Sequence, residues 1–199
     1  MDGMTRGTGR GETETAILEA TYRALCEYGY AQLSVQHIAE NFEKSKSAIY
    51  YHYDSKDDVL LSLLDFVVET FFEDLEAETG TDPVENLRLL VDRLVPASLV
   101  EEDLDLHTVM FELRSEALTK PVYRTKFTEV DRTVCQIVES YVRTAIDSGV
   151  VTGVDPEQTA RRIQQHALSA QTARLTTEDD WAVETARDAA FELLDVPQD

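Results

Sequence analysis

Residues Leu33–Lys56 read LSVQHIAENFEKSKSAIYYHYDSK, and this stretch decides the fold that we expect for the chain. Ser34 is a helix-capping residue type that directly precedes apolar positions at helical spacing, which predicts a short helix. The pattern breaks at residues 41–44 and restarts behind a second capping residue, Ser45. Two short helices joined by a turn of a few residues form a helix-turn-helix, whose second helix can lie in the major groove of DNA.

The flanking residues predict further helices around this pair. Glu12 to Tyr28 has a helical apolar face, and Gly29 is expected to end that helix with a left-handed cap. Ser55 to Asp58 resembles a capping box, which predicts a long helix running to about Glu78.

The remainder of the chain also has helical periods. Residue Pro83 is expected at the first position of a helix that stops at Pro96. Later helices are expected over residues 101–118 and 121–148, from Pro156 onwards, and behind the capping residues 177–180. No segment alternates with the period of a strand, so the sequence predicts an all-α fold.

The run from Thr15 to Leu60, which includes the helix-turn-helix, resembles the DNA-binding domain of the TetR/AcrR family of one-component transcriptional regulators. The resemblance is carried by Glu27-Tyr28-Gly29-Tyr30, Ser34-Val35-x-x-Ile38-Ala39 and Tyr50-Tyr51-His52-Tyr53-x-Ser55-Lys56. It implies a three-helix helix-turn-helix head followed by a helical bundle that binds an effector and dimerises through its last two helices. The chain departs from the family pattern at Glu43, where a Gly is usual, and at Ala48, where a Thr is usual.

The resemblance also implies a division of the chain. We expect a flexible arm over residues 1–11, a DNA-binding domain over 12–56, and an effector-binding and dimerisation domain over 57–199. The arm carries Arg6 and Arg10, which could lie along the DNA backbone, although a tail without a role is the alternative.

Roles in DNA binding are carried over from the family residue by residue. The side chains expected to face bases are Gln36, Lys46, Ser47 and Tyr50. Those expected to hold phosphates are Ser34, Tyr51, His52 and Lys56. Tyr53 is expected to be buried in the core.

An effector pocket is expected between the helices of the body. Its predicted lining is Phe66, Leu94, His107, Met110, Phe111, Arg114, Tyr123, Phe127 and Tyr141. Each aromatic side chain, taken singly, could instead fill a bundle core. Residues seven apart share a helical face, so His107 and Arg114 are expected to orient the ligand, and Arg114 would suit an anionic or acyl-type effector.

The charge of the chain is unusual for a DNA-binding protein. It carries 18 Lys and Arg against 39 Asp and Glu, a formal net charge of −21. Residues 1–56 hold 6 basic and 8 acidic residues, whereas residues 57–199 hold 12 and 31, and only five of the 18 basic residues are Lys. Such a surface is typical of a salt-loving cytoplasm, where ions screen self-repulsion, with an ordinary acidic regulator as the alternative.

The sequence does not indicate an enzyme, a metalloprotein or a membrane protein. The sequence has no phosphate-binding loop, no HExxH motif and no paired metal-ligand spacing, so we expect neither an enzyme nor a metal site or cofactor. No apolar run approaches the roughly 20 residues of a membrane span and no signal segment is present, which predicts a cytoplasmic protein without membrane contact. Cys26 and Cys135 are expected to be reduced core thiols.

The sequence therefore predicts a homodimeric repressor that binds a palindromic double-stranded operator and releases it when a small-molecule effector binds. The alternative is a helical protein-interaction module that has lost sequence-specific DNA binding, which Glu43, Ala48 and the net charge keep open.

Overall fold

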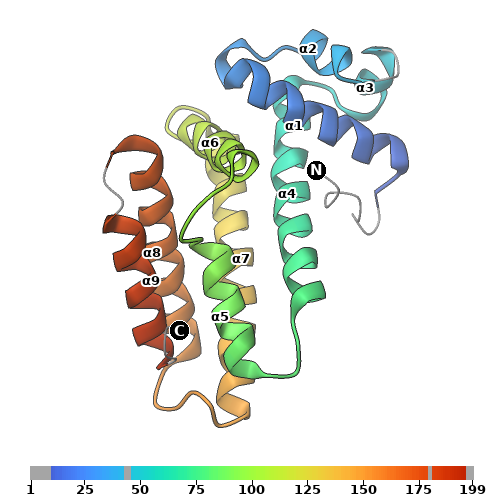
Figure 1. Ribbon diagram of the computed structural model, residues 1–199. Helices are drawn as coiled ribbons and strands as arrows, with labels where there is room; N and C mark the ends of the chain where they lie inside the picture. Colours follow the sequence, from blue (N-terminus) through green and yellow to red (C-terminus); the bar gives the residue numbers. More distant parts are fainter. Residues whose placement is uncertain (1–9, 43–45, 179–180, 196–199) are drawn as a thin grey trace. The chain divides into compact units, whose positions relative to one another are not determined.

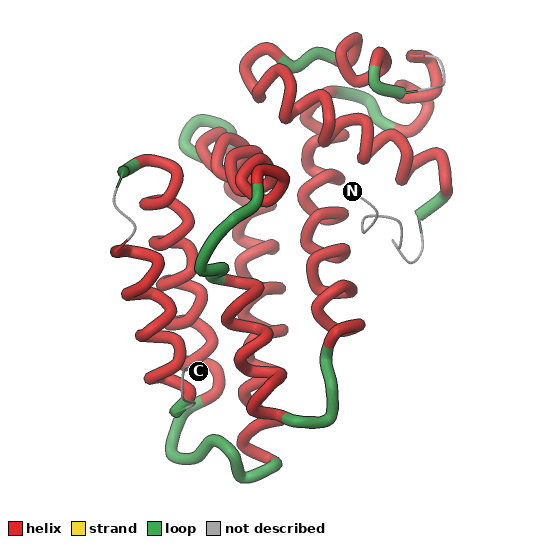
Figure 2. Tube along the Cα trace, viewed as in Figure 1, coloured by secondary structure: helices red, strands yellow, loops and turns green. Residues whose placement is uncertain are grey.

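The computed structural model describes residues 10–42, 46–178 and 181–195, and over these ranges it contains nine α-helices and no β-strand (Figures 1 and 2). The all-α prediction is confirmed. The helices are α1 (Glu12–Gln32), α2 (Val35–Glu40), α3 (Lys46–His52), α4 (Lys56–Glu78), α5 (Pro83–Leu94), α6 (Glu101–Glu116), α7 (Pro121–Asp147), α8 (Pro156–Thr176) and α9 (Trp181–Leu194). None of the helices in the described ranges combines the length and the apolarity that crossing a bilayer requires. Some residues singled out in the sequence lie outside the described residues: Arg6, Glu43, Lys44, Ser45, Asp179 and Asp180.

Side-chain caps set the starts of the helices around the helix-turn-helix. The Ser34 hydroxyl accepts a hydrogen bond from the His37 N–H at 3.2 Å and so begins α2. At α4, the Ser55 hydroxyl accepts from the Asp58 N–H at 3.1 Å, and the Asp58 carboxylate accepts from the Asp54 N–H at 3.2 Å. The first bond is that of the predicted capping box, whereas the return bond comes from the N–H of the residue before the cap.

Gly29 breaks the helical backbone of α1, but the predicted end of the helix at this residue is wrong, because one more helical turn follows to Gln32. Its φ of 66° and ψ of 164° lie in a region that residues with a Cβ rarely adopt. A Cβ placed on Gly29 would also meet the Glu112 carboxylate of α6 at 3.3 Å. That carboxylate accepts a hydrogen bond from the Tyr30 N–H at 2.8 Å, so the glycine allows α6 to bind the end of α1.

The chain packs into two compact units. One comprises Met1–Asp74 and Thr108–Val130, and therefore holds the helix-turn-helix with the end of α6 and the start of α7. The other comprises Leu75–His107 and Asp131–Asp199. This is a division by packing, and the functional division at residues 56 and 57 stays a prediction.

In the second unit, α8 and α9 form a hairpin whose small residues allow close packing (Figure 1). Ala160 and Ala167 of α8 and Ala186 and Ala190 of α9 are buried, and small buried residues let two helices approach closely.

The same hairpin caps the end of α5 with side-chain donors. The Gln171 amide donates to the Leu94 carbonyl at 3.2 Å, and Arg174 donates to the Pro96 carbonyl. Arg187 donates to the Val95 carbonyl at 2.7 Å and to the Asp92 carboxylate at 2.6 Å. Carbonyls at a helix end have no partner within the helix, and these bonds supply one.

The prediction that both cysteines are core thiols is wrong for Cys26, which is exposed on α1. The buried stripe of α1 runs through Ala24 and Leu25, and the next residue turns about 100° away from it. Cys135 is half-buried, and neither cysteine forms a disulfide.

We expect Gly29→Ala to lower the free energy of unfolding by about 1–2 kcal/mol, because the left-handed backbone and the contact with Glu112 both oppose a Cβ. Gly149→Ala is the matched control, since Gly149 also has a positive φ, 79°, but nothing lies within 4 Å of an added Cβ. Urea unfolding of both variants would measure the difference. Equal losses would mean that the Glu112 contact adds nothing to the requirement for glycine at position 29.

Candidate nucleic-acid interface

Helix α3 presents one polar face to solvent and one apolar side chain to the core. Lys46 and Ser47 are exposed, and Tyr50 and Tyr51 are 50% and 86% exposed. Ile49 is buried and fixes the helix against its neighbours. Because two neighbouring aromatic side chains are exposed together among polar ones, this face is a candidate contact surface.

Contacts within α2 and α3 orient two of the predicted base-facing side chains. The Lys46 ammonium lies 5.9 Å from the centroid of the Tyr50 ring, one helical turn away. The Gln36 amide donates to the Glu40 carboxylate at 3.1 Å, which orients the amide on the exposed side of α2.

Helix α1 supports both short helices from behind. The rings of Tyr28 and His37 stack with centroids 4.0 Å apart, and Arg23 donates to the Asn41 carbonyl at the end of α2 at 3.1 Å. Tyr53, buried as predicted, follows α3 and donates its hydroxyl to Glu14 at 3.4 Å. Burial raises the pKa of Tyr53 to about 12, so the hydroxyl stays a neutral donor at physiological pH.

Two of the four predicted phosphate-holding residues lie at the end of α3, and a third precedes α2. Tyr51 and His52 are exposed at its end, with their rings 5.3 Å apart and nearly perpendicular. Ser34 caps α2 as an acceptor, and a serine hydroxyl still has its own O–H to donate.

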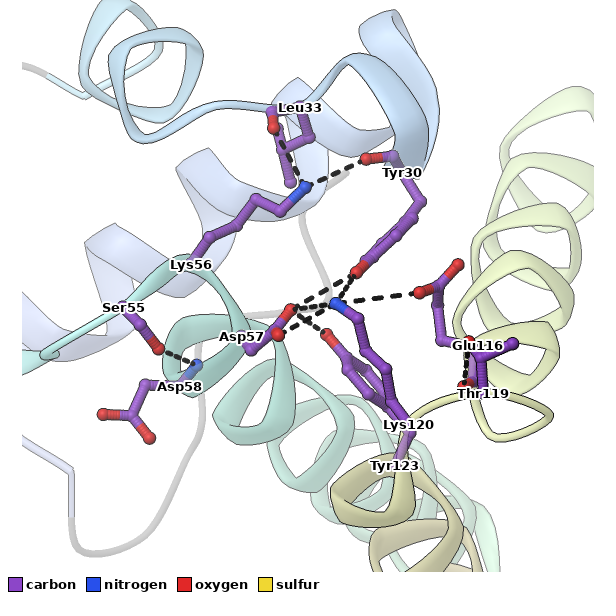
Figure 3. Close-up of polar contacts among 10 residues, drawn as sticks. All are labelled: Tyr30, Leu33, Ser55, Lys56, Asp57, Asp58, Glu116, Thr119, Lys120 and Tyr123. Atoms are coloured by element: carbon purple, nitrogen blue, oxygen red, sulfur yellow. Dashed lines mark hydrogen bonds and ion pairs between the residues drawn. The ribbon is translucent and has the colours of Figure 1, made fainter.

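Lys56 has structural contacts that the sequence did not predict. Its ammonium donates to the Tyr30 and Leu33 carbonyls at 3.2 and 3.1 Å, and lies 4.3 Å from the centroid of the Tyr30 ring (Figure 3). These carbonyls belong to the last turn of α1 and the residue after it, where a cation compensates the negative end of a helix. Burial lowers the pKa of Lys56, which reflects the cost of partly burying its charge. Its hydrogen bonds to the two carbonyls join the end of α1 to the start of α4.

A cluster of polar side chains joins the same junction to the corner between α6 and α7 (Figure 3). We call it the Lys120 cluster, and its members are Tyr30, Asp57, Glu116, Lys120 and Tyr123. The Lys120 ammonium donates to the two Asp57 carboxylate oxygens at 2.9 and 3.1 Å and to the Tyr30 hydroxyl. Asp57 also accepts from the hydroxyls of Tyr123 at 2.9 Å and Tyr30 at 3.3 Å, while Glu116 lies 3.7 Å from Lys120.

The charges of this cluster stabilise one another. Burial by itself raises the pKa of Asp57, but hydrogen bonds from Lys120 and Tyr123 outweigh it and hold that pKa below its usual range. Hydrogen bonds to Tyr30 and Asp57 raise the pKa of Lys120. Burial and the neighbouring Asp57 raise the pKa of Tyr123, so its hydroxyl remains a donor.

The predicted effector-pocket residues are divided between the two units. Phe66, Met110, Phe111, Arg114, Tyr123 and Phe127 lie in the first unit, and Leu94, His107 and Tyr141 lie in the second. Phe66, Leu94, Tyr123 and Phe127 are buried, and Phe111 is 37% exposed. The Arg114 guanidinium lies 4.4 Å from the centroid of the Phe127 ring, and the Tyr141 hydroxyl is 2.9 Å from that of Thr79.

Arg10, which could lie along the DNA backbone or have no role, pairs with Glu69 of α4, and its guanidinium lies 6.0 Å from the centroid of the Phe66 ring. Sequence reasoning also missed Tyr30, Asp57 and Lys120 as a group. A signal was present, because Lys120 is one of only two lysines beyond residue 56 and it immediately precedes a helix.

Comparisons with known proteins find relatives of both the helix-turn-helix segment and the whole fold. The family model described as "Bacterial regulatory proteins, tetR family" matches residues 17–63. A TetR transcription regulator from Haloarcula marismortui, known from its crystal structure, is 36% identical. The similarity covers 92% of this chain and 97% of that chain, with a TM-score of 0.79.

More distant relatives extend the similarity. The HTH-type transcriptional repressor AcnR of Corynebacterium glutamicum is 25% identical over 161 residues, which are 81% of this chain and 80% of that protein. The fatty acid degradation regulator FadR of Bacillus halodurans is 21% identical, with a TM-score of 0.70 over 94% of this chain and 97% of that chain. At this identity the similarity to FadR concerns the fold alone.

The pKa shifts predict how the cluster's contribution to stability depends on pH. The pKa of Asp57 is lowered from 3.8, so its contribution is present above that value and is lost as the pH falls through the folded-state pKa. The pKa of Lys120 is raised from 10.5, so its contribution is complete below that value and is lost as the pH rises through the folded-state pKa. The pairing is therefore intact over about pH 5–9.

We expect Asp57→Asn to lower the free energy of unfolding by about 1 kcal/mol over that range, a value suited to a partly exposed pair. The difference from wild type should shrink below about pH 4. Chemical denaturation at a series of pH values would measure it, with Asp147→Asn, at the exposed end of α7, as the control for charge number. A difference that stays constant to pH 3 would contradict the ionic origin of the contribution.

Proposed function

We propose that this chain, which belongs to the TetR family of transcription regulators, is a ligand-responsive repressor that binds a palindromic DNA operator as a homodimer. Regulators of this family bind DNA and dimerise. The observation that carries the proposal is the exposed polar face of α3, with Lys46, Ser47, Tyr50 and Tyr51, on a helix that Ile49 anchors to the head.

The proposed contacts follow from the chemistry of these side chains. Gln36, Lys46, Ser47 and Tyr50 would face the bases, since a lysine suits guanine and a glutamine suits adenine. Ser34, Tyr51 and His52 would donate to phosphates. Lys56 donates two of its three N–H groups to carbonyls, which leaves one for a phosphate.

The proposed dimer interface lies on the hairpin of α8 and α9. Trp181 at the start of α9 is 65% exposed, and an exposed tryptophan is a common anchor in protein interfaces. Two heads would then enter successive major grooves, about 34–36 Å apart on one face of the DNA.

An effector that binds better to the conformation with low DNA affinity would release the operator by shifting the population towards it. We propose residues 57–199 as the effector-binding and dimerisation domain. Within the first unit, the proposed pocket lining is Phe66, Met110, Phe111, Arg114, Tyr123 and Phe127. An anionic or acyl-type effector would suit the guanidinium of Arg114. The target is chromosomal DNA, so the proposed location is the cytoplasm.

We also propose a salt-loving source. The net charge of −21 and the similarity to the Haloarcula marismortui regulator support it. The second candidate function is a protein-interaction module without DNA specificity, which Ala48 favours because it lacks the hydroxyl that the family often uses on phosphate.

We expect Lys46→Ala to weaken binding to the operator by about 1–3 kcal/mol and to affect random duplex much less, because a base contact is lost. Lys56→Ala should weaken both duplexes alike, because it acts on the backbone and on the junction of α1 and α4. Fluorescence anisotropy with the upstream DNA of the gene, at high KCl, would measure both. Equal losses on operator and random DNA for Lys46→Ala would remove its base-reading role, and an absence of binding to any duplex would favour the interaction module.

We expect the melting temperature to rise by about 10 °C between about 0.1 and 2 M KCl, which for this size corresponds to about 3 kcal/mol. The reason is that salt screens the repulsion among the excess carboxylates. A neutral osmolyte at the same water activity is the control. A melting temperature that is constant or falls with KCl would contradict the salt-loving source.

A further inference from the structure

The corner between α6 and α7 holds the end of α1 at two points. Through the side chain, Lys120 donates to the Tyr30 hydroxyl, and Asp57 accepts from both (Figure 3). Through the backbone, the Glu112 carboxylate accepts from the Tyr30 N–H at 2.8 Å. Tyr30 is therefore restrained on both sides by residues that lie far from it in the sequence.

Tyr30 lies close to the start of the DNA-reading helices. It follows the break at Gly29 and is four residues before Ser34, which caps α2. Lys56 holds the carbonyls of Tyr30 and Leu33 in the same turn. A movement of Tyr30 would thus change the angle at which the chain enters α2.

A second ion pair on α7 provides a comparison. Lys126 pairs with Asp65 of α4 at 2.5 Å and with Glu129 of its own helix at 3.8 Å. This pair also joins α7 to α4, but its partners do not include the end of α1.

We infer that Lys120 is a positioning residue for DNA binding, which ties Tyr30 and Asp57 to the α6–α7 corner and thereby fixes the spacing of the two half-sites that the dimer accepts. The inference rests on the proposed function, because it requires a dimer that binds two half-sites.

The geometry of DNA gives the inference a measurable consequence. Each added base pair moves a half-site by roughly 3.4 Å along the axis and rotates it by roughly 34°. A head held at one angle cannot follow that rotation and loses one half-site. A head freed at Tyr30 can adjust, so the dimer should bind a wider range of spacings while each head still recognises its half-site.

The experiment begins with selection of duplexes from a random pool by the wild-type protein at high KCl. The selected operator is then made with about one to three base pairs added or removed between its half-sites, together with a duplex that holds a single half-site. Anisotropy titrations compare wild type, Lys120→Met, Tyr30→Phe, Lys120→Arg and Lys126→Met. Methionine keeps an apolar stem of similar length, and Tyr30→Phe removes only the hydroxyl, which protects the test against a folding defect.

Wild type should bind the altered spacings about tenfold or more weakly than the selected one, as expected when one of two linked half-sites is lost. Lys120→Met and Tyr30→Phe should reduce this preference to about threefold or less, with affinity for the single half-site within about twofold of wild type. Lys120→Arg should keep the preference for the selected spacing, because the positive charge is kept. Lys126→Met should also keep that preference, because its partners do not include the end of α1.

Four outcomes would overturn the inference. These are an unchanged spacing preference in Lys120→Met and Tyr30→Phe, an equal loss on every duplex, the same relaxation in Lys126→Met, or a wild-type protein that accepts all spacings. If the wild-type protein enriches no duplex at all, the proposed function fails, whereas in the four outcomes above DNA binding itself stands.

Discussion

A single ammonium group, that of Lys120, holds together three segments that are far apart in the sequence: the end of α1, the start of α4 and the corner between α6 and α7. Helix α3, which presents Lys46, Tyr50 and Tyr51, buries only Ile49, and α2 buries only Ile38, so both short helices rely on packing against their neighbours. The cluster is stable because each donor in it meets an acceptor. The carboxylate of Asp57 accepts from the ammonium and from two phenols, so a partly buried charge has its hydrogen bonds supplied.

Local chemistry made much of the fold predictable. Ser34, Ser55, Asp82 and Asp155 each accept a bond from the first turn of the helix that follows, and residues of this kind can be read directly from a sequence. Gly29 was predictable for the same reason, because few residues other than glycine adopt its backbone conformation. The family resemblance supplied the expected roles on α2 and α3, which remain predictions about DNA.

Contacts between distant residues were not predictable in this way. Lys120 and Asp57 are separated by 63 positions, and no periodicity indicates that they meet. Lys56 was expected to hold phosphate from its motif alone, yet two of its N–H groups are donated to carbonyls at the end of α1. Cys26 shows the limit of composition arguments, because a residue type that is usually buried can fall one position outside a buried stripe.

The cap on α5 also shows what an arginine provides that a lysine does not, in a chain with only five lysines. Arg187 serves the Val95 carbonyl with one nitrogen and the Asp92 carboxylate with another, a pairing that requires the planar fork of a guanidinium. A lysine there would offer one compact, strongly hydrated charge in place of two directed bonds. Exchange of Arg187 for lysine, which is usually regarded as conservative, would therefore keep the charge between these two helices but not both of their bonds.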